Sequence, residues 1–367
     1  MINIKTMLTG VLIATCFFSC KKDLSTTSGN PVGGNISNSN NNAFSSTSVF
    51  SQVNIVADTM GFGAWVIDPN LGNAWGIAAP PNGPIWISDN HTGVSTIYNR
   101  ANGATLRPPV TIPAAMSGET GAPTGVLFNS TTDFGGNKFI FAGEDGIIAA
   151  WSGGNVAMKV ADRSQFNAVY KGIAMANDGR ANFLYLANFK GGKVDVFNRE
   201  FKYVTTKPFW DPTIPAGFAP FNIVNIGGQL YVTYAKQKGP DNEDDEAGIG
   251  NGYVDIFNPD GTFVKRFVSK GELNSPWGVA LAPAGFAATV QTILVGNFGS
   301  GRINIYDMMG NYMGQLKSHG KSITIWGLWA IDFLKNNVPG GNATDPLYFT
   351  AGPDEESHGV FGYLQLQ

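Results

Sequence analysis

The stretch SPWGVALAPAG, residues 275–285, opens an apolar run on a Trp-Gly pair and ends it at Pro283 and Gly285. The same arrangement recurs along the chain, with Gly or Asn opening each apolar run. The six copies are NAWGIA (73–78), APTGVL (122–127), VYKGIA (169–174), APFNIV (219–224), SPWGVA (275–280) and TIWGLW (324–329). Their central residues are Gly76, Gly125, Gly172, Asn222, Gly278 and Gly327, at spacings of 49, 47, 50, 56 and 49. A period near 50 over six copies indicates a repeat architecture.

Each copy continues with more strand signals. The second runs are IWISDN, FIFAGE, LYLANF, LYVTYA, ILVGNF and LYFTAG, and most copies add a third run such as VDIFNP or INIYDM. These runs alternate with period two, as half-buried strands do, and a weaker fourth segment ends several copies. Four antiparallel strands in each of six units predict an all-β fold, a six-bladed β-propeller.

The ends of the chain predict how the ring closes. The last copy ends in GVFGYLQLQ, its third strand, so its fourth strand is missing. The segment SQVNIVAD, residues 51–58, precedes the first copy and has no partner there. We expect this N-terminal strand to supply the missing outer strand, because this pairing removes two open sheet edges at once. The first strands line the channel, and their glycines are expected where backbones approach closely.

Composition supports β-structure and excludes some functions. Only 14% of residues are charged, 47 are Gly and 12% are aromatic. The formal net charge of −3 leaves no basic surplus for phosphates, so nucleic acid is not an expected partner. The two cysteines are Cys16 and Cys20, so a disulfide, a thiolate metal site or a cysteine nucleophile is excluded from the body of the protein.

The N-terminus has the features of a targeting signal. Residues 1–20 carry Lys5 and then an apolar stretch too short for a comfortable membrane span, as in a secretory signal. The end of this stretch, FFSCKKD, resembles a bacterial lipoprotein signal and implies lipidation of Cys20, although Phe17 stands where Leu is commonest. Cys16 and an ordinary signal peptide are the alternatives.

Residues 21–47 are rich in Ser, Asn and Gly and predict a flexible tether before a propeller at 48–367. The expected location is extracytoplasmic, on the periplasmic side or the cell surface. The lipid anchor would be the only contact with the membrane.

Three longer motifs carry a family resemblance. They are VIDPNLGNAWGIA (66–78), GNGYVDIFNPDGTFVKRF (250–267) and LYFTAGPDEESHGVFGYL (347–364). The blade pattern resembles the NHL class of propellers, and these motifs resemble a family of secreted bacterial propellers of unknown function over about residues 50–367. The resemblance implies a fold and a location but no catalytic residues. Related propellers include lactonases and lyases with a metal in the channel, an analogy of fold alone.

Polar residues that end the second strands are the first candidate site. Alignment of these strands places Asp89, Asn188 and Asn297 at one ring position, with Glu144 one residue further along its own blade. We expect them on the face that holds the second-to-third-strand loops and the connections between blades. Oxygen ligands of this kind suit calcium or another divalent cation. The alternative is that they satisfy the backbone of turns.

The histidines and one acidic run are further candidates. His91, His319 and His358 are the only histidines, and all three are expected on the same face in consecutive blades. Imidazole with nearby carboxylates is transition-metal chemistry, and solvated loop histidines are the alternative. The run DNEDDE, residues 241–246, lacks the pattern of an EF-hand loop. A solvated loop is the default for it, and ordering by calcium is the alternative.

The sequence therefore predicts a binding or interaction module that takes a protein, a glycan or a small ligand at its loop-rich face. The alternative is a metal-dependent hydrolase or lyase of the lactonase-like propeller type. The sequence contains no G-x-S-x-G element and no Walker-type phosphate loop. No catalytic residue is predicted, and a divalent cation is the only cofactor that the candidate residues suggest.

Overall fold

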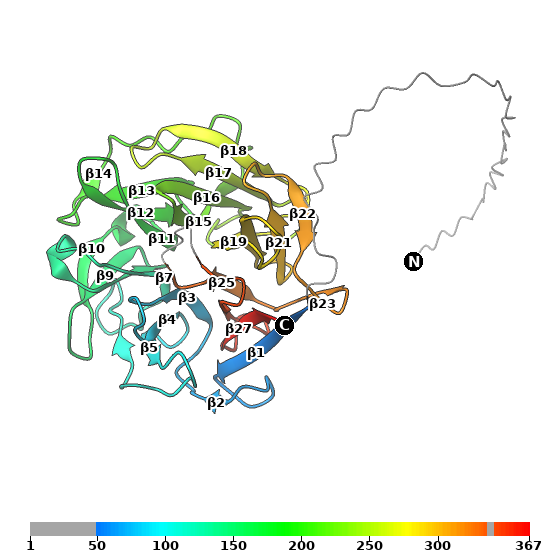
Figure 1. Ribbon diagram of the computed structural model, residues 1–367. Helices are drawn as coiled ribbons and strands as arrows, with labels where there is room; N and C mark the ends of the chain where they lie inside the picture. Colours follow the sequence, from blue (N-terminus) through cyan, green and yellow to red (C-terminus); the bar gives the residue numbers. More distant parts are fainter. Residues whose placement is uncertain (1–48, 336–340) are drawn as a thin grey trace, which may run out of the picture. The chain divides into compact units, whose positions relative to one another are not determined.

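The structure is a computed structural model that describes residues 49–335 and 341–367. The predicted signal peptide, the lipidation site Cys20 and the tether at 21–47 lie outside the described residues. Six sheets stand around a central axis, as Figure 1 shows, and form a six-bladed β-propeller; each has four antiparallel strands, and a short fifth strand is added to the last one. The only helical elements of the described chain are the short 3-10 turns η1 (Phe134–Gly136) and η2 (Ser164–Phe166). The all-β prediction is confirmed.

The first three blades follow one another along the chain, each running from the axis outward. Blade one is β3 (Ala74–Ala78), β4 (Ile85–Asp89), β5 (Val94–Tyr98) and β6 (Val110–Thr111). Blade two is β7 (Pro123–Phe128), β8 (Phe139–Gly143), β9 (Ile147–Trp151) and β10 (Met158–Asp162). Blade three is β11 (Tyr170–Asn177), β12 (Asn182–Asn188), β13 (Lys193–Phe197) and β14 (Tyr203–Val204).

Blades four and five repeat this order, and blade six departs from it. Blade four is β15 (Phe218–Ile226), β16 (Gln229–Lys236), β17 (Gly252–Phe257) and β18 (Phe263–Ser269). Blade five is β19 (Pro276–Ala282), β20 (Thr292–Asn297), β21 (Arg302–Tyr306) and β22 (Tyr312–Gln315). A small hairpin, β23 (Lys317–Ser318) with β24 (Lys321–Ser322), then leads to blade six, which is β25 (Leu328–Asp332), β26 (Leu347–Ala351), β27 (Val360–Leu366), β1 (Phe50–Ala57) and β2 (Val66–Ile67).

Blade six joins the two ends of the propeller. Strand β1 pairs antiparallel with β27 from Phe50 opposite Leu366 to Ala57 opposite Val360. The prediction that segment 51–58 supplies the missing outer strand is confirmed. The short strand β2 adds to β1 in parallel and covers the outer edge of the sheet. Closure through both ends of the sequence makes the ring one continuous folding unit.

Apolar side chains fill the spaces between neighbouring blades. Trp86 of blade one stacks on Phe139 of blade two with ring centroids 4.0 Å apart, and Tyr98 stacks on Phe361 of blade six at 6.1 Å. Each hydrophobic cluster at a blade junction joins residues of adjacent sheets. Large rigid rings bury much area for little side-chain entropy, which explains the many aromatic residues on the strands.

Every inner strand carries a β-bulge at the repeat motif. The register of the first strand against the second shifts at this point in all six blades. The glycines of the motif lie at a close approach: a Cβ on Gly76 would come 2.4 Å from the carbonyl oxygen of Thr124, and one on Gly172 would come 2.0 Å from Oδ1 of Asn222. The expected crowding is confirmed.

The sixth repeat is aligned differently from the sequence alignment. Leu328 pairs with Ala351 as Pro276 pairs with Asn297, so Ala330, and not Gly327, occupies the position of Gly278. Gly327 lies just before the strand with φ +69°, where a side chain would collide with the carbonyl of Gly352. The WG pair of this repeat therefore serves a turn, and the inner strand begins after it.

Candidate functional site at the two ends of the channel

An aromatic layer closes the channel near its loop-rich end. The residues just before the motif glycine share one ring position in the six blades; they are Trp75, Thr124, Lys171, Phe221, Trp277 and Trp329. The rings of Trp75 and Trp329 stack at 3.6 Å, and those of Trp75 and Trp277 meet edge to face at 6.5 Å. Blades one and five are not neighbours, so these rings meet across the channel.

Lys171 is the one charged residue at this ring position. Its side chain is only 3% exposed, and its ammonium lies over the Trp75 ring, 5.2 Å from the centroid. It forms an ion pair with Glu144 and lies 3.4 Å from Oδ1 of Asp244. These carboxylates come from the second-to-third-strand loops of blades two and four, so three blades meet at one buried ammonium.

Amide side chains extend this cluster to blades one and six. Asn90 donates a 2.8 Å hydrogen bond to Glu144, and Asn73 donates one of 2.7 Å to Glu356. The indole N–H of Trp329 donates to Oδ1 of Asn73 at 2.9 Å, which joins the cluster to the aromatic layer. The polar mouth is the name we give to Lys171, Glu144, Asp244, Glu356, Asn73 and Asn90.

Electrostatics in the polar mouth favour a mixture of charged and neutral groups. Burial opposes the charged form of Lys171, but the neighbouring carboxylates, Glu144 foremost, outweigh it and raise the pKa of its ammonium. Burial raises the pKa of Glu356 to about 7, while Lys171 and the hydrogen bond from Asn73 act in the opposite direction. Glu356 is therefore close to half-protonated at neutral pH.

The acidic run 241–246 forms part of the wall of this mouth. Asp244 pairs with Lys171, Glu243 pairs with Lys190 at 2.6 Å and Glu246 pairs with Lys236 at 2.7 Å. These ion pairs join the run to blades three and four, but the side chains of Glu243 and Asp244 are 52% and 76% exposed, so the structure agrees with the solvated loop that the sequence suggested. Ordering by calcium stays a prediction.

The predicted ring position of Asp89, Asn188 and Asn297 is confirmed, and the hydrogen bonds that these side chains form stay within their own blades. Asp89 is fully buried; its Oδ2 accepts a hydrogen bond from the backbone N–H of Thr96 at 2.8 Å, and its Oδ1 has no hydrogen-bond partner within the described residues. Asn188 binds Asp195 and the backbone N–H of Gly191. Asn297 binds the backbone of Asn274, Val295 and Arg302. Of this candidate set, only Glu144 is in the polar mouth, and cation binding by the other three stays a prediction.

The structure does not bring the three histidines together. His91 is exposed on the blade-one loop, and Nδ1 of His358 lies 2.8 Å from Oδ2 of Asp58 at the Ala57 end of β1. His319 lies beside Phe50, at the opposite end of β1, because the β23–β24 hairpin carries it there. A strand of this length spans roughly 23 Å, so the expected common face is wrong for His319. Within residues 49–335 and 341–367, no three His, Cys, Asp or Glu side chains are grouped so as to hold a metal ion.

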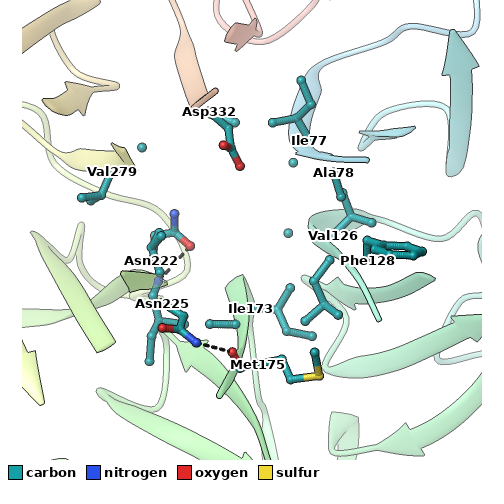
Figure 2. Close-up of a pocket in the computed structure, with 18 of the residues that line it drawn as sticks. Ile77, Ala78, Val126, Phe128, Ile173, Met175, Asn222, Asn225, Val279 and Asp332 are labelled. Carbon is teal, nitrogen blue, oxygen red and sulfur yellow. Dashed lines mark hydrogen bonds between the residues drawn. The ribbon is translucent and has the colours of Figure 1, made fainter. Parts of the chain in front are cut away.

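The other end of the channel is a cavity of about 460 Å³ lined by both apolar and polar groups, drawn in Figure 2, which we call the far-end funnel. Its lining includes a complete ring of branched aliphatic residues, one from each inner strand: Ile77, Val126, Ile173, Ile223, Val279 and Ile331. Trp277 of the aromatic layer also lines it. The aromatic layer therefore separates the funnel from the polar mouth.

One carboxyl group lines the funnel next to the ring of aliphatic side chains. The ring position after the aliphatic residues holds Ala78, Leu127, Ala174, Val224, Ala280 and Asp332. Asp332 is the only polar member, and Figure 2 shows its side chain directed into the cavity. Burial raises the pKa of this carboxyl to about 6, although the N–H of Leu334 and the charge of Arg100 favour its ionised form.

Sequence reasoning named two residues of the polar mouth, Glu144 and Asp244 of the run 241–246, but missed its other members and Asp332. Lys171 stands in VYKGIA at a position that other copies fill with Trp, Thr or Phe, so a charged residue in a buried column was visible. Asp332 was hidden because the sixth repeat was aligned on Gly327 instead of Ala330. Glu356 and Asn73 carry no local signal, since only the fold joins them.

Comparison with known proteins gives relatives over most of the chain. No protein-family model matches the sequence. Uncharacterized protein R648 of Acanthamoeba polyphaga mimivirus is 33% identical over 314 residues, covering 81% of this chain and 76% of the relative. This chain belongs to the same family. Uncharacterized protein L690 of the same virus is 35% identical over 318 residues, covering 81% of each protein.

Solved structures support the fold alone. Virginiamycin B lyase from Staphylococcus aureus is similar with a TM-score of 0.50 and 11% identity, covering 87% of this chain and 100% of that chain. Regucalcin, a calcium-binding protein from Agrobacterium tumefaciens, is similar with a TM-score of 0.50 and 15% identity, covering 80% of this chain and 90% of that chain. Residues 49–335 and 341–367 contain no helix that is long and apolar enough to cross a membrane.

Proposed function

We propose that this protein is a binding module whose loop-rich face takes a partner protein, with a Lys or Arg side chain of the partner entering the polar mouth. The observation that carries this proposal is the charge imbalance of the cluster. Three carboxylates, those of Glu144, Asp244 and Glu356, gather at the single ammonium of Lys171. A second cation would satisfy the carboxylate oxygens that Lys171 does not reach.

The rim of the same face supports a protein partner. Five large apolar side chains stand on separate loops and connections of this face with at least 63% of their surface exposed: Met60, Met116, Phe166, Ile249 and Trp326. Apolar contacts around a central charged pair are common in protein interfaces. The glycan and small-ligand alternatives of the sequence analysis gain no comparable support, because the floor of the mouth is filled by the stacked indoles.

A random peptide library panned on the purified protein tests the proposal. We expect enriched peptides to carry Lys or Arg beside apolar residues. The double variant Asp244→Asn/Glu356→Gln replaces two carboxyl groups by neutral amides and leaves the Lys171–Glu144 pair intact, and it should weaken binding about tenfold, the worth of one charge-assisted hydrogen bond. Glu200→Gln, which replaces one carboxyl group by an amide on an exposed turn of the opposite face, should leave binding unchanged. Peptides without basic residues, or equal binding to the double variant, would contradict the proposal.

The membrane anchor completes this proposal and has a separate basis. The signal at residues 1–20 and Cys20 suggests that the module is lipid-anchored outside the cytoplasm. A face turned toward partners at the end of a tether fits that arrangement.

A hydrolase or lyase is the second candidate function. The observation that favours it is Glu356, whose carboxyl has a pKa of about 7 and faces a buried ammonium, as general acid–base catalysis requires. Turnover of a lactone or ester that disappears in Glu356→Gln, while the protein remains folded, would support this candidate over the binding module.

A further inference from the structure

We propose that the far-end funnel is a binding site for a small apolar molecule that carries a primary ammonium group, with Asp332 as its counter-ion. This site is distinct from the polar mouth, because the aromatic layer lies between them. The inference does not depend on a partner protein at the loop-rich face.

The shape and lining of the funnel suit the apolar part of such a ligand. Its volume of about 460 Å³ falls in the range of small-molecule sites, and a ring of aliphatic side chains supplies the apolar part of a mixed lining. All six inner strands contribute a branched aliphatic side chain, so the walls belong to a rigid closed ring. A site of this kind is formed before the ligand arrives, which lowers the entropic cost of binding.

The polar atoms of the funnel leave one position for a charged group. Nδ2 of Asn222 donates to the carbonyl of Trp277 at 2.9 Å, and Nδ2 of Asn225 donates to that of Met175 at 2.9 Å. Their Oδ1 atoms accept backbone N–H groups as well. The side-chain amides of both asparagines therefore already have hydrogen-bond partners within the protein.

Only one of the two carboxyl oxygens of Asp332 accepts a hydrogen bond. Its Oδ1 accepts the N–H of Leu334 at 2.7 Å, and within the described residues no donor reaches its Oδ2. Arg100 lies near enough to influence the carboxyl, but it donates to the carbonyls of Gly83 and Pro80 instead. Asp332 is partly exposed and lines the funnel with this oxygen unpaired, so an ammonium group from a ligand could form a charge-assisted hydrogen bond with it.

A purely structural role for Asp332 makes a different prediction. The bond to Leu334 holds a turn in which Leu334 has φ +54°, and one oxygen is enough for that task. Asp332→Asn retains an oxygen that can accept this bond and removes only the charge. Asp260→Asn is a matched control, because Asp260 also accepts an N–H, that of Thr262 at 2.9 Å, in an exposed turn of the same face outside the funnel.

Calorimetric titration of the full chain with three matched probes tests the proposal: 4-phenylbutylamine, 4-phenylbutanol and 4-phenylbutyrate. At pH 7.5 we expect the amine to bind about tenfold more tightly than the alcohol, with the carboxylate weakest. Asp332→Asn should bring the amine to the affinity of the alcohol and leave the alcohol unchanged. Asp260→Asn should behave as the wild type.

Three outcomes would overturn the proposal. They are equal affinity for amine and alcohol in the wild type, unchanged amine binding in Asp332→Asn, and no binding of any of the probes. The comparison of amine with alcohol needs no variant, so it decides the question even if Asp332→Asn is unstable. None of these results bears on the polar mouth, whose test uses other residues and probes.

Discussion

The two ends of the channel are built by the same six inner strands and have opposite character. At the loop-rich end, side chains from five blades form a polar cluster that includes one buried ammonium. At the far end, six aliphatic side chains leave a cavity with a single carboxyl group. The difference arises because loops of variable sequence surround the first end, whereas repeated strand residues line the second. A symmetric scaffold thus supports two sites, and departures from the repeat mark both of them.

Both ends require a closed ring, and the largest expected effect comes from breaking it. Deletion of residues 51–58 would remove six paired positions against β27 and the buried side chains of Ile55 and Val56. We expect loss of the cooperative unfolding transition, measured by circular dichroism during heating. Deletion of residues 24–45, before the first strand, should leave the transition in place. If both deletions melt as the full chain does, closure by β1 is not what holds the ring together.

Removal of the aromatic layer would join the two ends and is the next largest change. Trp329→Ala deletes a fully buried ring that contacts Trp75, Trp277 and Phe298. A large-to-small change of this kind costs about 3–5 kcal/mol of unfolding free energy, measured by urea denaturation. Trp326, three residues earlier, is 68% exposed, so Trp326→Ala should change stability by no more than about 0.5 kcal/mol. Similar losses in the two variants would show that the layer does not carry the packing assigned to it.

The smallest expected effect is a pH dependence of the unfolding free energy that differs between the two ends of the channel. Burial raises the pKa of Glu356 to about 7 and that of Asp332 to about 6, so the folded protein holds both protons more tightly than the unfolded chain. Each group therefore opposes folding increasingly as pH rises, over pH 4.5–7 for Glu356 and pH 3.8–6 for Asp332.

Urea denaturation at several pH values checks this expectation. Glu356→Gln and Asp332→Asn should each remove one part of the decrease in unfolding free energy that the wild type shows as pH rises. Between low and neutral pH, the unfolding free energy of each variant should therefore increase by roughly 1–3 kcal/mol relative to the wild type. Nearly all of the gain should come below pH 6 for Asp332→Asn, while that for Glu356→Gln should continue to pH 7. A difference from the wild type that stays constant with pH would show that the carboxyl is not shifted.

The sequence predicted the fold more completely than it predicted the candidate functional sites. Repeat spacing, strand period and the unpaired segment 51–58 were enough for six blades and their closure, because these follow from local patterns and from the need to pair every sheet edge. The ring position of Asp89, Asn188 and Asn297 was also correct. Their roles were not readable, because whether a polar side chain faces a ligand or its own turn depends on the surrounding packing.

The sequence alone determined the repeat, the propeller and the way the ring closes. Only the tertiary structure decided that Lys171 meets Glu144, Asp244 and Glu356, which lie 27, 73 and 185 residues away along the chain. It also decided that Asp332, and not a residue near Gly327, faces the funnel. The physical reason is that hydrogen bonds between adjacent strands are encoded locally, while convergence at the axis depends on the curvature of the whole ring and on one bulge in every inner strand.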